Sequence, residues 1–227
     1  MALSSGRLYR ILSFDRVVQI FEKRELHFAH PSSWSDPYEV RLHHAGSHQV
    51  FGQCWCTKGV SDAMWRIYSS NHLGVRISTS TRKLREALQP SAKALGYTLR
   101  LGEVRYESQQ NITEELRDIH NDLKEKFDVA RAVDALFLKR DAFDHESEYR
   151  AVIHNPNVAD GEVLTGLKLP IDPYKFIDSI LLDPRAPDEL VDALGFYFKE
   201  KIKLNKRVTR SVLYKSPSPL IVADPDA

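Results

Sequence analysis

The stretch "DHESEYRAVI", residues 144–153, sets Glu146, Glu148 and Arg150 at alternate positions before an apolar run. On a β-strand, alternate side chains share one face, so these three charges would line one face and the apolar residues the other. A strand with one solvated face explains this pattern without any chemistry. Two neighbouring carboxylates can also divide a catalytic task, because different surroundings can separate their pKa values.

Strand and helix signals surround this stretch without regular alternation. Upstream, the sequence predicts strands over 7–12, 25–30, 50–57, 73–79 and 97–107, helices over 13–24 and 61–70, and one or two helices within 112–143. Downstream, it predicts strands over 166–171, 176–184 and 207–214 and a helix over 188–202. Because short strands and helices follow no βαβ order, the pattern predicts the α+β class.

The chain length of 227 residues suits a single domain. We expect this domain over residues 1–215, with a helical insertion at about 108–143 and a flexible tail at 216–227. The 32 basic and 31 acidic residues give a formal net charge of +1, so no global field favours nucleic acid or membrane. No apolar run approaches transmembrane length, and charges come too early for a signal peptide. The expected compartment is the cytoplasm.

The two cysteines, Cys54 and Cys56, are separated by one residue. On a strand their side chains would lie on one face, too close for an unstrained disulfide, so we expect reduced thiols. Two thiols without further spaced ligands do not make a metal site. The sequence also lacks the common nucleotide and zinc signatures, and no metal is expected.

Other side chains suited to binding lie near the N-terminus and in the short predicted helix. Arg10, near the end of the first predicted strand, is either a surface charge or a planar fork for phosphate in a cleft. The aromatic residues Trp65 and Tyr68 have the helical spacing that is typical of core packing. The alternative for these rings is a wall on which a flat heterocycle stacks.

Several segments, in order, resemble a bacterial family catalogued as domain of unknown function 2971. The segments that carry the resemblance are "LYRILSFDRVVQIFEKRELHFAHPSSWSDPYE", "CWCT" followed by "MWRIYSSNHLGVRI", "ESEYR" after a helical stretch, and "IDSILLDP". They span most of the chain, and the weakest match lies across 82–135.

The order of parts also resembles ADP-ribosyltransferases of the arginine, serine, glutamate type. These have an Arg on the first strand, a Ser/Thr-containing strand before a short helix, and a late Glu-x-Glu strand. The resemblance implies two packed mixed or antiparallel sheets with flanking helices. By position, Glu148 would hold the nicotinamide ribose 2′-hydroxyl, and Glu146 would orient or deprotonate the acceptor.

The same resemblance implies that NAD is the substrate. Arg10 would contact the NAD phosphate or nicotinamide ribose, Thr57 would be the remaining hydroxyl of the middle motif, and Tyr68 would stack on nicotinamide. The NAD-binding residues expected in this way are Tyr9, Arg10, Thr57, Trp65 and Tyr68. The motif "CWCT" departs from Ser-Thr-Ser, because cysteines stand where hydroxyls are common.

The resulting hypothesis is an NAD-dependent ADP-ribosyltransferase, a toxin-like or antiphage defence effector that modifies a nucleic acid or a protein. A toxin of this kind implies a neutralising antitoxin as a partner. Two alternatives remain open. One is a non-catalytic module that binds a nucleotide or a partner, which the altered "CWCT" motif favours. The other is a metal-dependent nuclease effector, since nucleases also use clustered carboxylates, with Mg²⁺.

Overall fold

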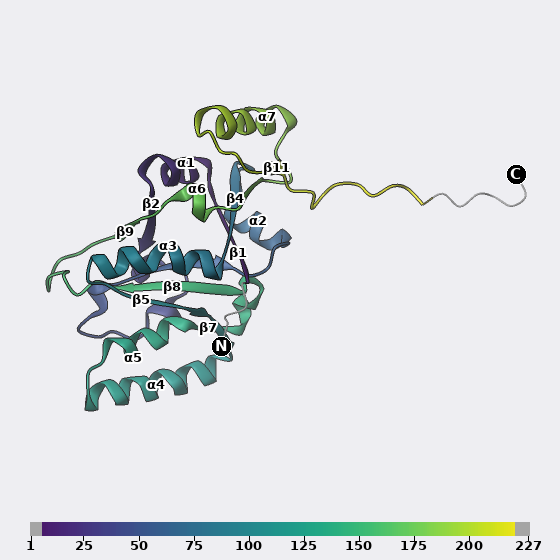
Figure 1. The fold of residues 1–227 in the computed structure, drawn as a ribbon. Coiled ribbons are helices and arrows are strands. Elements are labelled where there is room, and N and C mark those ends of the chain that lie inside the picture. The colour runs from purple at the N-terminus through teal and green to yellow at the C-terminus, as the bar shows by residue number, and fades with distance from the viewer. Residues whose placement is uncertain (1–5, 221–227) are drawn as a thin grey trace, which may run out of the picture.

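The computed structural model describes residues 6–220, in which helices flank a large mixed β-sheet (Figure 1). The predicted α+β class is confirmed. The strands of the sheet are β1 (Arg7–Ser13), β2 (Glu25–Ala29), β3 (Val50–Cys56), β4 (Gly74–Ser80), β5 (Thr98–Glu103), β8 (Glu148–His154), β9 (Gly166–Pro170), β10 (Ser179–Leu182) and β11 (Val208–Arg210). Two shorter strands, β6 (Arg105–Glu107) and β7 (Leu138–Arg140), pair with each other in parallel.

The nine strands of the large sheet form one hydrogen-bonded network rather than two separate sheets. Strands β11, β10, β4 and β1 make one half, and β5, β8, β3, β2 and β9 make the other. The halves join where Tyr9 of β1 lies opposite Cys56 of β3. The expected two sheets are therefore two halves of one sheet, because this single bridge keeps them continuous.

Strand β3 has two different edges. Along one edge it pairs with β8 over its full length, from Val50 opposite His154 to Cys56 opposite Glu148. Along the other edge, β1 pairs only at Cys56 and β2 only at Gly52. Two strands cannot both follow one edge at the usual spacing of about 4.8 Å, so β1 and β2 diverge. Within the described residues, this leaves positions 53–55 of β3 without a ladder partner on that edge, and we call this opening the sheet gap.

The α-helices are α1 (Phe14–Lys23), α2 (Asp62–Tyr68), α3 (Thr81–Ala94), α4 (Gln109–Glu125), α5 (Val129–Asp134), α6 (Pro173–Phe176) and α7 (Asp188–Phe196). Local sequence sets their limits. Helix α1 buries one apolar stripe and ends at Arg24, which has a left-handed φ of 52°. Ser80 caps α3 by accepting a hydrogen bond from the Lys83 amide at 3.2 Å.

The two faces of the sheet carry different cores. The larger core packs α1, α3 and α6 against one face, and Leu8, Phe28 and Trp55 are among its large buried side chains. On the other face, a smaller cluster from α5 and the turn after α5 packs against Val50 and Val152, and α4 packs against Ala135 and Leu138 in a separate cluster. Figure 1 shows α4 and α5 beyond β5, on the side of the molecule away from α1 and α7.

The region predicted as helical at 112–143 is only partly so. Helices α4 and α5 fill its first part, but Leu138–Arg140 form β7, and a 3₁₀ turn covers Asp141–Glu146. A strand of three residues is too short to leave a periodic signal in the sequence. The domain limits at 1–215 remain a prediction. Of the predicted tail, residues 216–220 are exposed without regular structure, and 221–227 lie outside the described residues. No helix in the described part of the chain has the length and apolar character needed to cross a membrane.

Candidate active site

Glu146 and Glu148 belong to different elements. The 3₁₀ turn ends at Glu146, β8 begins at Glu148, and Ser147 between them has a left-handed φ of 45°. Thr57 holds this turn, since its amide and its hydroxyl both donate to the Ser147 carbonyl, at 2.9 and 3.0 Å. The prediction of one strand face through Glu146, Glu148 and Arg150 is therefore wrong at Glu146, where the chain bends.

The two carboxylates lie in a buried ionic network. Lys139 Nζ donates to Glu146 Oε2 and to Glu148 Oε1, both at 2.6 Å. Arg150 Nε donates to Glu148 Oε2 at 2.6 Å, and the same guanidinium also pairs with Glu39. Glu148 is 6% exposed and Arg150 is 0% exposed, so the strand face that carries them is not open to solvent. Three carboxylates and two cations share this site, so each charge is stabilised by its neighbours.

The surroundings separate the pKa values of the two carboxyl groups. Burial opposes ionisation of Glu148, but the charge of Arg150, hydrogen bonds and the charge of Lys139 hold its pKa well below the usual range. Burial raises the pKa of Glu146 to about 7, and its hydrogen bond with Glu148 acts in the same direction. Glu148 is therefore ionised at neutral pH, whereas Glu146 can gain or lose a proton there.

Tyr68, the last residue of α2, lies beside these carboxylates. Burial raises the pKa of its hydroxyl, and the negative charges of Glu146 and Glu148 raise it further. The residue is 47% exposed, so part of the ring is open to a ligand. Cys54 lies on the same face of the sheet, opposite Arg150, and burial raises the pKa of its thiol to about 12. Cys54 is therefore an inert neutral thiol at this site.

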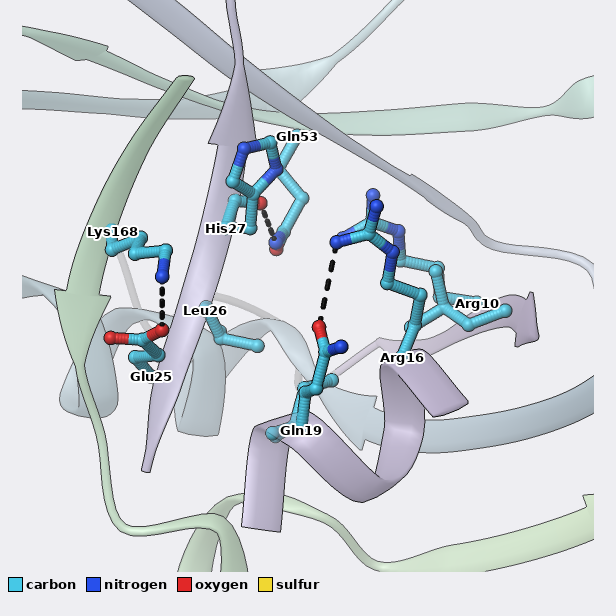
Figure 2. A pocket seen from close by; sticks show the side chains of 10 residues that line it. Arg10, Arg16, Gln19, Glu25, Leu26, His27, Gln53 and Lys168 are labelled. Carbon is cyan, nitrogen blue, oxygen red and sulfur yellow. Dashed lines mark hydrogen bonds and ion pairs between the residues drawn. The ribbon is translucent and has the colours of Figure 1, made fainter. Parts of the chain in front are cut away.

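A cavity of about 280 Å³ opens on the α1 side of the sheet gap (Figure 2). Arg10 reaches it from β1, Arg16 from α1 and Gln53 from β3. The full lining is Arg10, Leu12, Arg16, Gln19, Ile20, Glu25, Leu26, His27, Gln53 and Lys168. The Gln53 amide donates to the His27 carbonyl at 2.8 Å, which connects β3 to β2 across the floor of the gap.

The charges that line the cavity suit an anion. Lys168 is paired with Glu25 at 2.8 Å, but Arg10 and Arg16 form no ion pair with any residue that the structure describes. Burial lowers the pKa of Arg10 and that of His27, and the charge of Arg10 lowers the latter further. His27 is thus neutral at neutral pH and available as a hydrogen-bond partner. Two guanidinium groups without a counter-ion suit a phosphate group.

The cavity and the carboxylates flank the sheet gap from its two sides. Gln53 lines the cavity, whereas Cys54, the next residue, shares its face with Glu148, because side chains alternate along a strand. Burial lowers the pKa of Arg10, and this residue lies close enough to Cys54 and Tyr68 to interact with them electrostatically. The four elements that meet here are β1, α2, β3 and β8. A ligand lying through the gap would have the guanidinium groups at one end and the carboxylates at the other.

The other candidate residues have supporting positions. The Arg76 guanidinium lies 4.7 Å from the Tyr9 ring and 6.0 Å from the Trp65 ring. Trp65 is only 1% exposed, so both faces of its ring are covered by protein and it cannot stack on a ligand in this arrangement. Thr57 contacts the Ser147 backbone, as described above. The structure therefore brings Tyr68 to the carboxylates and Arg10 to the gap, while Tyr9 and Trp65 pack elsewhere.

Several residues of the site carry no distinguishing sequence signal. Glu39 comes from a 3₁₀ turn at Pro37–Val40, far from Arg150 in the chain. Arg16 and His27 look like ordinary exposed positions of an amphipathic helix and a strand. Only Lys139, just upstream of "ESEYR", lies near a recognised motif. Both cysteines are free thiols, as expected. Among the described residues, no three His, Cys, Asp or Glu side chains are grouped for a metal.

Comparisons with known proteins give one family and a set of distant structures. The model of a family described as protein of unknown function (DUF2971) matches residues 64–151, which confirms the resemblance from α2 to the Glu148 strand. Among curated proteins, no significant match is found. DarT of Thermus sp. 2.9, solved in complex with NAD+, covers 93% of this chain and 98% of its own, with 12% identity and a TM-score of 0.43.

The same protein solved in complex with ADP-ribosylated single-stranded DNA gives 12% identity and a TM-score of 0.42, with 92% of this chain and 95% of that chain covered. A third structure, in complex with carba-NAD+, gives 10% identity and a TM-score of 0.42 over 92% of this chain and 97% of that chain. A likeness at this level assigns no role to any residue.

Proposed function

We propose that the protein is an ADP-ribosyltransferase that uses NAD as its substrate, with Glu148 as the catalytic carboxylate. The observation that supports this most is the pair of neighbouring carboxyl groups with separated pKa values, one ionised and the other with a pKa of about 7. Such a pair can stabilise a cation and accept a proton in the same reaction.

NAD would lie through the sheet gap. Its diphosphate would bind in the cavity beside Arg10 and Arg16, which form no ion pair within the described chain and match phosphate geometry. Its nicotinamide would stack on Tyr68, whose ring is partly open. The ribose between them would then face Glu148. This placement uses both sides of the gap. It would hold the ribose and the nicotinamide, the two groups joined by the bond that breaks.

In the reaction, the bond between ribose C1′ and the nicotinamide nitrogen breaks, and its electron pair leaves with nicotinamide. The ribose ring becomes an oxocarbenium cation, which the Glu148 carboxylate stabilises while it holds the 2′-hydroxyl. A nucleophile of the acceptor then forms a new bond to C1′. Glu146 takes the proton that this nucleophile loses, a step that a group with a pKa of about 7 performs well near neutral pH.

Lys139 and Arg150 would orient Glu148 for this task. Each of its oxygens accepts one charged hydrogen bond at 2.6 Å. A carboxylate has about four lone-pair sites, so each oxygen retains capacity for the ribose hydroxyl. Fixed donors on the far side of a carboxylate also keep its charge directed at the place where positive charge develops.

The acceptor in this proposal is a macromolecule, either a nucleic acid or a protein. It would approach Glu146 beside the partly exposed Tyr68. We further propose a toxin-like or antiphage role in the bacterial cytoplasm, with a neutralising antitoxin as partner. This part of the proposal rests on the family resemblance of the sequence.

The test is transfer of radiolabel from NAD, labelled in its adenylate phosphate, to macromolecules of a cell lysate. We expect the unmodified protein to label a nuclease-sensitive or a protease-sensitive acceptor, and Glu148→Gln to reduce labelling by about 100-fold or more. Glu86→Gln, which changes an exposed carboxylate paired with Arg82, is the matched control and should label normally. Equal labelling by Glu148→Gln and the control would overturn the catalytic role of Glu148.

A second candidate is a binding module without catalysis, and one observation favours it. Both oxygens of Glu148 are engaged by Lys139 and Arg150, and the residue is only 6% exposed. Calorimetric binding of NAD with no release of nicotinamide would support this module. Release of nicotinamide that depends on Glu148 would exclude it.

A further inference from the structure

Helix α2 is too short to hold Tyr68 in place by itself. It has seven residues, and isolated helices of fewer than about 12 residues are marginal in water. Only one of its residues, Trp65, is buried. Tyr68 is the last residue of the helix, where the final carbonyl groups have no partner within the helix. Contacts from other elements must therefore fix the end that carries Tyr68.

The residues after β10 provide these contacts. The Ser69 hydroxyl donates to Asp183 Oδ2, and the Gly74 amide donates to Ser69 Oγ at 2.9 Å. The Arg185 guanidinium donates to the carbonyls of Trp65 and Ser69, at 3.1 and 2.8 Å. The Trp65 and Ser69 carbonyls also accept the amides of Ser69 and His72, so Arg185 adds a charged donor to a helix end that is already hydrogen-bonded. We call Ser69, Asp183 and Arg185 the α2 clamp.

The clamp is internally rigid. Arg185 donates to both Asp183 oxygens, from Nε at 3.0 Å and from a terminal nitrogen at 2.8 Å, which is a bidentate pair. Asp183 is 0% exposed and Ser69 is 2% exposed. A Cβ atom at position 74 would overlap Ser69 Cβ and Oγ, so Gly74 allows β4 to approach the serine this closely.

The other end of α2 is held less firmly. Ser61 caps it at 3.3 Å, and Asp62 pairs with Arg66 on the exposed surface. Tyr214 adds a hydrogen bond to Asp62 from the same exposed surface. Exposed pairs of this kind contribute little to stability. The buried hydrogen bonds at α2 therefore concentrate at its C-terminal end, on Ser69 next to Tyr68.

We propose that the α2 clamp is a positioning device that fixes the Tyr68 ring for its ligand. Ser69 follows Tyr68 directly in the chain, so a shift of Ser69 moves the Tyr68 backbone with it. Asp183 and Arg185 act through Ser69 and the helix carbonyls and do not touch the ligand. This inference rests on the proposed function, in which Tyr68 stacks on the nicotinamide of NAD.

The test compares two serine variants of similar burial. Ser69→Ala removes the clamp hydroxyl, whereas Ser78→Ala removes a 2.6 Å hydrogen bond to Ser179 between β4 and β10, away from α2. Ser78 is 2% exposed, as Ser69 is, so both changes remove a buried hydroxyl, and the thermal midpoint of each variant gives its loss of stability. We expect Ser69→Ala to raise the KM for NAD by roughly tenfold or more, with a small change in kcat, and Ser78→Ala to leave KM unchanged.

Two further variants and a hydrogen-exchange measurement make the result independent of folding. Ser69→Thr retains the hydroxyl and should restore KM, and Asp183→Asn should resemble Ser69→Ala while its thermal midpoint shows that it is folded. Hydrogen exchange of the amides at positions 64–70 should accelerate in Ser69→Ala but not in Ser78→Ala, with or without NAD.

The outcomes distinguish this inference from the proposed function. If the unmodified protein releases nicotinamide and Ser69→Ala matches Ser78→Ala in both KM and hydrogen exchange, the clamp is not a positioning device. If the unmodified protein neither binds NAD nor releases nicotinamide, the proposed function fails, and the role of the clamp toward NAD fails with it. Faster exchange and a raised KM in Ser69→Ala alone support the inference.

Discussion

Glu146 and Glu148 differ in environment although only Ser147 separates them. Glu148 contacts both Lys139 and Arg150, whereas Glu146 contacts only the lysine of that pair. The extra guanidinium keeps Glu148 ionised, and burial raises the pKa of Glu146 to about 7. The alternating sequence shows two carboxylates but not this asymmetry, because it arises from side chains that meet only in the folded chain.

The raised pKa of Glu146 predicts the pH dependence of transfer. A proton acceptor works only when it is deprotonated, so the rate should rise as the pH increases through about 7 and then level off. Glu146→Gln should lower the rate by about 100-fold, remove this rise, and leave NAD binding intact. Transfer rates between pH 5.5 and 8.5 check this. A rise through pH 7 that persists in Glu146→Gln would show that another group titrates.

Lys139 pairs with two buried carboxylates, so its removal should destabilise the folded protein. Lys139→Met leaves the negative charges of Glu146 and Glu148 with less compensation, and we expect a loss of roughly 3–5 kcal/mol in the free energy of unfolding. Arg82→Met, which breaks an exposed pair with Glu86, should have little effect. Urea unfolding at pH 7.5 compares the two variants. If the two variants have the same free energy of unfolding, the ionic network around Glu148 rearranges or takes up protons without losing stability.

At the scale of elements, the bend at Ser147 sets the positions of Glu146 and Glu148 relative to each other. A left-handed φ is unfavourable for a serine, and Thr57 stabilises it through two hydrogen bonds to one carbonyl. Away from this bend, α1, α2 and strands β1 to β4 lie where the sequence predicts them, whereas α3 and α6 are not among the predicted elements. The bend itself has no periodic signal and no glycine, so the sequence predicts the start of the strand two residues too early.

Thr57 can be tested by a change that keeps its shape. Thr57→Val removes the hydroxyl bond to Ser147 but retains the backbone bond from the amide of residue 57. We expect a loss of about 1 kcal/mol in stability and a lower transfer rate, because Glu146 would be less well placed. Thermal melts and rate measurements check both effects. A rate equal to that of the unmodified protein would show that the hydroxyl is not needed at this bend.

At the scale of the whole molecule, the sheet gap brings the two halves of the site together. Strands β1 and β2 diverge from one edge of β3, and the cavity and the carboxylates lie on opposite sides of that opening. The order of motifs in the sequence predicts Arg10, Tyr68 and Glu148 as parts of one site. In the structure Tyr68 lies near Glu148 and Arg10 near Tyr68, and their shared role stays a prediction. The sequence does not predict the cavity, because its lining comes from β1, α1, β2, β3 and β9 and depends on strand pairing.

The cavity gives a prediction that separates binding from chemistry. Arg16→Gln removes a cation from the proposed diphosphate site but not from the carboxylate network. We expect the KM for NAD to rise roughly tenfold with kcat nearly unchanged, since loss of a charged hydrogen bond weakens binding in the ground and transition states alike. Arg82→Gln, on the exposed surface of α3, is the control. A fall in kcat at constant KM would place Arg16 in the chemical step instead.

The most direct measurement of the central claim is the time course of nicotinamide release from NAD, followed by chromatography, for the unmodified protein, Glu148→Gln and Glu86→Gln. If Glu148 stabilises the ribose cation, the unmodified protein and Glu86→Gln release nicotinamide at the same rate, and Glu148→Gln is slower by about 100-fold or more. Release that is equal in all three proteins, or absent from all three, would contradict the account.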